Sequence, residues 1–277
     1  YTNQPLGIRQ TVKLFFPVMG KHYWYFTAYF CLFLFMPFLN ILIRHLSKLQ
    51  HRLLIFTCVC AFCIMSPISK QLGYEVFHID GGSSFLWLAV LYAIGSYLRL
   101  YPEDFAKRNR KAYLLVYLAC TVLVWASKFL ITAVTQKVFG RATASNILVS
   151  YISPFIVLGS VCLFLFFSQL QIRRCKKMIP KIASVSFGVY LISEQPYIRA
   201  MFVTNRLAGS VEQPWYLMLG LVLLWAIGIY LVCSAIDYLR KELFRLARVD
   251  TLCEKVACGI KRLCYRIVAK PDSGDRA

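Results

Sequence analysis

Charged residues are scarce in this sequence of 277 residues. Asp, Glu, Lys and Arg together make up 16% of the chain, whereas 59% of it is hydrophobic. A soluble domain has about a quarter charged residues, which help to cover its surface with groups that water solvates. This chain cannot cover a water-facing surface in that way, so we predict that lipid is the solvent for much of it.

Acidic residues are the rarer of the two charged kinds. The chain has 12 Asp and Glu against 32 Lys and Arg, which gives a formal net charge of +20. A charge of this sign can indicate nucleic-acid binding. Here, however, the basic residues lie in short blocks between apolar runs and in the C-terminal tail. That placement is typical of contacts with anionic lipid head groups, and we predict no nucleic-acid partner.

Familiar catalytic and metal-binding motifs are also missing. The sequence contains no P-loop, no G-x-G-x-x-G and no H-E-x-x-H. Of its four histidines, we expect His45 and His51 to be solvated residues of a cytoplasmic loop. The C-x-C-x-x-C pattern at 58–63 would spread its thiols around an apolar helix without any accompanying His or acid, so we predict no metal site.

Long apolar stretches dominate what is present. A helix needs about 20 apolar residues to cross the hydrocarbon of a membrane, whereas a barrel strand needs only about 10 alternating ones. We therefore predict an all-α polytopic membrane protein with about seven transmembrane helices. The predicted spans are residues 23–43, 52–68, 84–101, 112–134, 146–170, 182–203 and 215–239.

The loops between these spans differ in charge. The odd-numbered loops, counted with the adjoining ends of the spans, hold 13 Lys and Arg, and the even-numbered loops hold 5. Because basic loops stay on the cytoplasmic side, we predict a multi-pass protein of the cell membrane with Tyr1 outside and the C-terminus cytoplasmic. None of the 11 Cys falls in a predicted outer segment, which fits reduced thiols.

The regions outside the spans complete the predicted organisation. Residues 1–22 are an extracytoplasmic or interfacial lead-in, and residues 23–239 form the transmembrane helical domain. Residues 240–270 carry apolar residues at helical spacing with basic residues on the other face, which predicts a basic amphipathic helix on the inner leaflet. Residues 271–277 form a tail that we predict to be disordered.

Two charged residues within predicted spans are candidate substrate contacts. Glu194 lies in the sixth span next to Pro196, and a carboxylate at membrane depth normally faces a cavity or a cation. The alternative is that it sits at the outer interface and pairs with Arg199. Lys128 lies inside the fourth span, where it either lines a polar cavity that meets an anionic ligand or extends to the interface.

Aromatic residues gather at the outer end of the first span, and among them we single out Trp24 and Tyr29. An aromatic belt at the membrane surface is the usual reason for such a group. A platform on which a sugar ring stacks is the functional alternative. The pattern alone favours the belt.

Three segments together resemble the acyltransferase 3 family of membrane enzymes, of the polysaccharide O-acetyltransferase type. Residues 23–30 read YWYFTAYF and continue to MPFLN at 36–40, similar to the aromatic run and turn of that family. Residues 91–99 read LYAIGSYLR, which is similar to a helix end of the family. Residues 186–192 read SFGVYLI, which is similar to a third segment of the family. The resemblance covers about residues 15–238.

The resemblance implies an activity and its reactants. An acyl group, usually acetyl from cytoplasmic acetyl-CoA, would move to a hydroxyl of a cell-surface or lipid-linked glycan in a bacterial cytoplasmic membrane. The donor would be acetyl-CoA without a metal, and the partners would be the lipid bilayer, the glycan and the acyl-CoA. Trp24, Tyr29, Glu194 and Lys128 would be substrate-binding residues.

The sequence departs from the family pattern in two respects. Family members carry an arginine–histidine pair and an arginine pair in their early helices, which no segment here matches, so the catalytic residues stay unknown. Position 193 is Ser where family members often have His. Because the family has about ten helices, we expect this chain to be the last seven, with three upstream, and to be inactive alone.

Two other functions remain open. A transporter or flippase for lipid-linked sugars is compatible with several spans and with charged residues inside them. No matched pair of interrupted helices is visible in the two halves, however, which counts against a transporter. A non-catalytic scaffold or receptor is the third possibility, although the outer loops are short.

Overall fold

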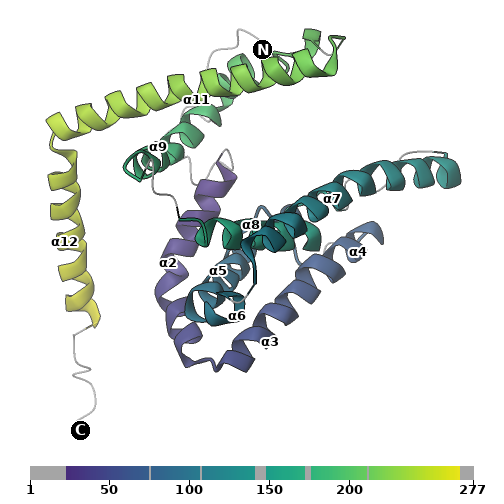
Figure 1. The fold of residues 1–277 in the computed structure, drawn as a ribbon. Coiled ribbons are helices and arrows are strands. Elements are labelled where there is room, and N and C mark those ends of the chain that lie inside the picture. The colour runs from purple at the N-terminus through teal and green to yellow at the C-terminus, as the bar shows by residue number, and fades with distance from the viewer. Residues whose placement is uncertain are drawn as a thin grey trace. The chain divides into compact units, whose positions relative to one another are not determined.

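The computed structural model describes residues 23–74, 76–106, 108–140, 148–171, 176–210 and 212–268. Every regular element in these ranges is a helix, as Figure 1 shows. The helices belong to two compact units, Tyr1–Arg173 and Arg174–Ala277, which are taken separately below. The predicted all-α class is thus confirmed for the part of the chain that is described.

Within the described residues, four helical segments are long and apolar enough to cross a membrane: Trp24–His45, Lys48–Gln71, Arg110–Val138 and Trp215–Leu246. Three further apolar helices are shorter: α5 (Phe85–Leu100), α8 (Pro154–Ser168) and α9 (Met178–Ser193). Each predicted span therefore contains an apolar helix. Since only four of these helices satisfy the length requirement by themselves, seven as the number of spans stays a prediction.

In the first unit, α2 (Trp24–His45) turns sharply into α3 (Lys48–Val59). Ser47 makes this turn possible because its hydroxyl accepts a bond from the Gln50 amide while the Gln50 side chain accepts one from the Ser47 amide. Such a capping box satisfies backbone donors that the first helical turn leaves free. The helix then widens into the π-helix η1 (Cys60–Met65) and ends as α4 (Ser66–Gln71).

The core of the first unit lies where these helices meet α5 and the turn before α8. Trp87 of α5 is its largest member and is only 2% exposed. The cluster draws on four separate segments, so it fixes their relative positions. Its buried members are Phe62, Cys63, Ile79, Trp87, Val90, Ile94 and Ile152.

The first unit has two distinct ends. At one end the α2–α3 link lies beside α6 (Glu103–Ala106), which connects α5 to α7 (Arg110–Phe139), because Lys48 contacts Glu103. At the other end the N-terminus of α2 and the 3-10 turn η2 (Asp80–Gly82) both contact Tyr151. The 22 residues of α2 separate the ends by about 33 Å, close to the thickness of the hydrocarbon layer.

The sixth predicted span, residues 182–203, is not one continuous helix in the second unit. Helix α9 ends at Ser193, and the short helix α10 (Pro196–Ile198) and the π-helix η3 (Arg199–Val203) follow it. Proline lacks the N–H that a helix needs and disfavours helical geometry at the residue before it. Gln195 instead caps α10, because its side-chain oxygen accepts a bond from the Ile198 amide at 2.9 Å.

Helix α11 (Trp215–Leu246) packs on α9 through a buried carboxylate. Asp237 is 1% exposed, and a methyl group placed on Gly188 of α9 would lie 2.2 Å from its carboxyl carbon. Arg240 and Lys241 of the same helix contact its oxygens at 2.8 and 2.9 Å. Lys241 also donates to the Ser184 carbonyl at 3.0 Å, so the carboxylate and its cations hold the two helices together.

The end of the chain differs from the predicted helix over 240–270. Helix α11 continues to Leu246, and a separate helix, α12 (Val249–Val268), runs in a different direction in Figure 1. Arg248, with φ of 51°, lies between them in the left-handed region, which an α-helix does not accommodate. The predicted lead-in at 1–22 and the tail at 271–277 lie outside the described residues.

We predict that Gly188→Ala weakens the second unit, because the added methyl group must displace a clamped carboxylate. Such overpacking typically costs about 1–3 kcal/mol. Gly220→Ala is the matched control, since Gly220 lies in a helix with no atom within 4 Å of the added carbon. Thermal unfolding of the purified protein in detergent should show a lower midpoint for Gly188→Ala alone, and equal midpoints for the two variants would contradict the packing role.

Candidate functional site

A network of four polar side chains lies at the α3–α6 end of the first unit, and we call it the Asp104 cluster: Lys48, Arg52, Tyr97 and Asp104. The side chains of Lys48 and Arg52 contact the two oxygens of Asp104 at 2.7 and 2.6 Å. The Tyr97 hydroxyl donates to Asp104 and accepts from Arg52, each at 2.5 Å. The cluster thereby ties α3, α5 and α6 together.

The electrostatics of this cluster are balanced internally. Hydrogen bonds from Lys48, Tyr97 and Arg52 hold the pKa of Asp104 well below the ordinary value of a carboxyl group. The pKa of Glu103 is also lowered, chiefly because Lys48 donates to it at 2.9 Å. Two cations therefore face two carboxylates that stay ionised at neutral pH. The network can hold α3, α5 and α6 together, but neither Glu103 nor Asp104 is suited to act as a general base.

His51 contradicts the expectation that it is a solvated loop residue. It is 0% exposed, and its Nε2 lies 3.0 Å from the carbonyl oxygen of Ala93 on α5. The ring of Tyr97 meets it edge-on, with centroids 5.2 Å apart. The sequence suggested a loop because it places His51 between basic residues, whereas the capped turn at Ser47 starts the helix earlier and directs this face toward α5.

The two ring nitrogens of His51 are in different situations. With a proton on Nε2 donated to the Ala93 carbonyl, Nδ1 is the nitrogen with a free lone pair, which is the form of a general base. Nδ1 is buried and has no hydrogen-bond partner. Because the whole ring is shielded, a substrate hydroxyl cannot reach it, and we assign His51 to positioning α3 on α5.

Further basic residues surround the Asp104 cluster at the same end of the unit. They belong to the last turns of α2 and α5, to the link between α6 and α7, and to the first turn of α7, and all are exposed. They are Arg44, Arg99, Arg108, Arg110 and Lys111. This end, which we call the basic end, is therefore strongly cationic even after Lys48 and Arg52 are neutralised by their acidic partners.

The opposite end of the unit presents aromatic side chains, and we call it the aromatic end. The rings of Trp24 and Tyr151 lie 5.6 Å apart. Tyr151 packs on Gly82, whose φ is 102°. No larger residue could replace this glycine, because an added carbon would lie 2.7 Å from the Tyr151 side chain. His78 and Asp80 also have positive φ, so a constrained turn supports the aromatic pair.

The four predicted substrate-binding residues are divided between the two units, and their joint role stays a prediction. Trp24 and Tyr29 share one end of α2, where Tyr29 stacks on Tyr25 at 6.2 Å and is 44% exposed. Lys128 is exposed midway along α7 and makes no ion pair with any described residue. Glu194 belongs to the second unit and pairs with Arg199 at 2.7 Å, as the alternative interpretation expected.

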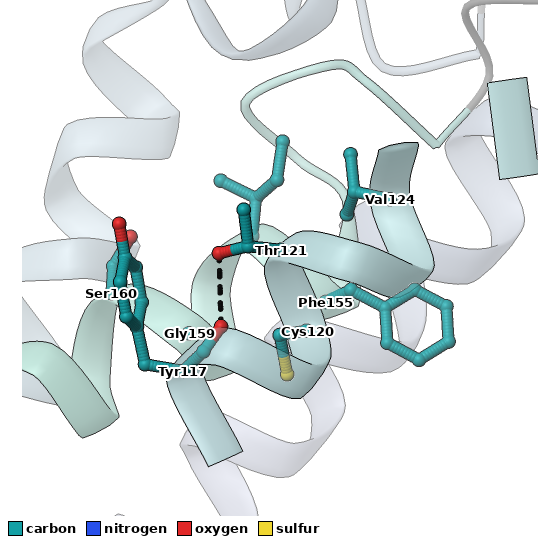
Figure 2. A pocket seen from close by; sticks show the side chains of 8 residues that line it. Tyr117, Cys120, Thr121, Val124, Phe155, Gly159 and Ser160 are labelled. Carbon is teal, nitrogen blue, oxygen red and sulfur yellow. Dashed lines mark hydrogen bonds between the residues drawn. The ribbon is translucent and has the colours of Figure 1, made fainter. Parts of the chain in front are cut away.

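Two cavities were not anticipated from the sequence. One, of about 160 Å³, lies between α7 and α8, where Gly159 faces Cys120. Figure 2 shows that the Thr121 hydroxyl beside it donates a hydrogen bond to the Tyr117 carbonyl. It is smaller than typical ligand sites, which begin near about 300 Å³. The other, of about 360 Å³, lies in the second unit and is lined by Ile192, Ile198, Phe202, Trp225, Gly228, Ile229, Val232, Cys233 and Ile236.

Asp237 is a buried charged residue that the sequence analysis missed. A buried carboxylate inside an apolar helix is costly and is retained where it has cationic partners. The signal was present, since Asp237 is the acid that precedes Arg240 and Lys241 by three and four residues, the spacing of helix neighbours. Its location against Gly188 also explains why SFGVYLI contains a glycine.

No group of three or more metal-ligating side chains that could hold an ion occurs among the described residues. Apolar helices of membrane-spanning length, with charge gathered at their ends, define a multi-pass membrane protein. The chain belongs to the acyltransferase 3 family: the model of that family, described as an acyltransferase domain, matches residues 3–236. Among curated proteins and solved structures, no match to the chain is found.

We predict that Asp104→Asn lowers the unfolding midpoint at neutral pH. Because the pKa of Asp104 is lowered in the folded state, its contribution to stability is complete above about pH 5. That contribution is lost as the pH falls through about 4 toward the folded pKa. The difference from wild type should therefore shrink on acidification. Thermal unfolding in detergent across this range checks it, with exposed Asp250→Asn as control, and a difference independent of pH would argue against the cluster.

Proposed function

We propose that the protein transfers an acyl group, most simply acetyl, from cytoplasmic acyl-CoA to a hydroxyl of a cell-surface or lipid-linked glycan. Membership of the acyltransferase 3 family supports transferase chemistry. The observation that carries the finer proposal is that exposed cations gather at one end of the first unit, whereas the exposed Tyr151 ring beside Trp24 lies at the other. A polyanionic donor and a sugar acceptor that approach from opposite sides of a membrane require such a separation.

The basic end is suited to the donor. Coenzyme A carries several phosphate charges, and exposed cations attract them and speed their encounter. Arg110 and Lys111 occupy the first turn of α7, which has no acidic residue. Cations at a helix N-terminus oppose the helix dipole by about 0.3–1 kcal/mol each. Their location therefore disfavours the helix locally and is better explained by an anionic partner.

The aromatic end is suited to the acceptor. Sugar rings stack on the apolar faces of Trp and Tyr, and Tyr151 is 57% exposed beside Trp24. The turn at Gly82 holds Tyr151 in place before any ligand arrives, which reduces the entropy lost on binding. Tyr29, Glu194 and Lys128 stay predictions as substrate contacts, and we name no catalytic base among the described residues.

We predict that Arg110→Gln raises the KM for acetyl-CoA by up to about fivefold, because one exposed charge contributes about 1 kcal/mol or less. The KM for the glycan should not change. Lys137→Gln at the far end of α7 is the matched control and should leave both constants unaltered. Radiolabelled acetyl transfer by the protein from its complete gene, with the parent cell's glycan as acceptor, measures them. Transport of lipid-linked sugar without any acetyl transfer would support the flippase instead.

We predict the reverse pattern for the aromatic end. Trp24→Ala or Tyr151→Ala should raise the KM for the glycan about three- to tenfold, the amount expected from loss of one aromatic contact, with the KM for acetyl-CoA unchanged. Trp24→Phe should retain most of the affinity. Trp215→Ala removes another exposed aromatic residue, from the start of α11, and controls for a general effect on membrane insertion. A glycan KM that stays at the wild-type value in both alanine variants would leave these rings as a membrane belt.

A further inference from the structure

Helix α12 has no role in the proposed reaction, and part of its exposed surface is apolar. The family match ends at residue 236, before this helix begins. The apolar residues Leu252 and Val256 on α12 are 65% and 56% exposed. An amphipathic helix that leaves its apolar face uncovered normally contacts another surface.

The helical positions of α12 sort its residues into three zones. In the sequence pattern alone, with about 100° per residue, positions 249, 252, 256, 260, 263 and 267, which are all Val, Leu or Ile, fall on one apolar stripe. Positions 255, 262 and 266, which are Lys, Arg and Arg, fall together along one edge of this stripe. The acids Asp250 and Glu254 fall on the other side of the helix, with Lys261. We call the row at 255, 262 and 266 the basic edge.

The junction with α11 places this stripe at a membrane boundary. Helix α11 is long and apolar enough to cross a membrane, and its last turns carry Arg240, Lys241 and Arg245, which are typical of the interface. The left-handed Arg248 then redirects the chain, so that α12 leaves the line of α11 in Figure 1. A helix that starts at the interface and turns away from the spanning direction can lie along the membrane surface.

We propose that α12 is an anionic-lipid-binding surface, which lies in the plane of the bilayer with its apolar stripe among the acyl chains and its basic edge on negatively charged headgroups. Lys and Arg beside an apolar stripe extend their aliphatic stems over hydrocarbon while their charges reach the phosphates. Each basic residue near such a surface contributes about 1 kcal/mol, whereas the acids on the other side of the helix face water.

Hydrogen–deuterium exchange of the full protein in nanodiscs tests this proposal. Amides in residues 249–268 should exchange more slowly in discs of POPC containing POPG than in discs of POPC alone. High salt should reduce this difference because it screens headgroup charge. Lys255→Glu should reduce it by about fivefold or more, the factor that corresponds to about 1 kcal/mol. Lys261→Glu, the same change on the other side of α12, should reduce it less.

A second pair of variants tests the apolar stripe. Leu252→Asp should speed exchange in both kinds of disc, whereas Ala257→Asp adds the same charge on the side of the helix that carries Asp250 and should not. Equal exchange in neutral and anionic discs, or equal effects of Lys255→Glu and Lys261→Glu, would overturn the proposal. Protection that appears only when two copies share a disc would assign the surface to self-association instead. None of these measurements depends on acyl transfer.

Discussion

Hydrocarbon cannot hydrogen-bond to a peptide group, and this constraint governs the whole structure. Every backbone N–H and C=O within the membrane must find a partner inside the protein, which makes helices the economical solution for apolar stretches of this length. The constraint also explains where the helices break. The interruption at Gln195 and Pro196 is acceptable because the Gln195 side chain replaces the missing backbone partner for α10.

The same cost of leaving polar groups unpaired decides how the charged residues inside the helical units are arranged. Asp237 is almost completely buried, yet Arg240 and Lys241 reach back along α11 to meet it, and their own exposure lets them remain solvated. Asp104 receives three donors from two other helices. In both units a carboxylate with cationic partners joins helices that apolar packing alone would allow to slide.

The two ends of the first unit differ in chemistry, and the family membership relates this difference to acyl transfer. Exposed cations collect at one end and the Trp24–Tyr151 pair lies at the other, about one hydrocarbon thickness away. The reaction that we propose joins a charged donor on one side of the membrane to a sugar on the other, which requires two unlike surfaces connected by helices. The lipid contact that we propose for α12 is of a third kind, and this helix begins after residue 236, where the family match ends.

The sequence by itself determined the all-α membrane class of the protein and the approximate positions of its apolar helices. Runs of apolar residues predict helices because length and hydropathy are local properties, although the sequence analysis did not predict that the helix breaks between Ser193 and Pro196. Tertiary structure decided the rest. Burial of His51, the pairing of Asp104 with three partners up to 56 residues away, and the contact of Gly188 with Asp237 all arise from distant segments. No periodicity along the chain reveals which helix faces which, because that choice depends on the packing of several helices at once.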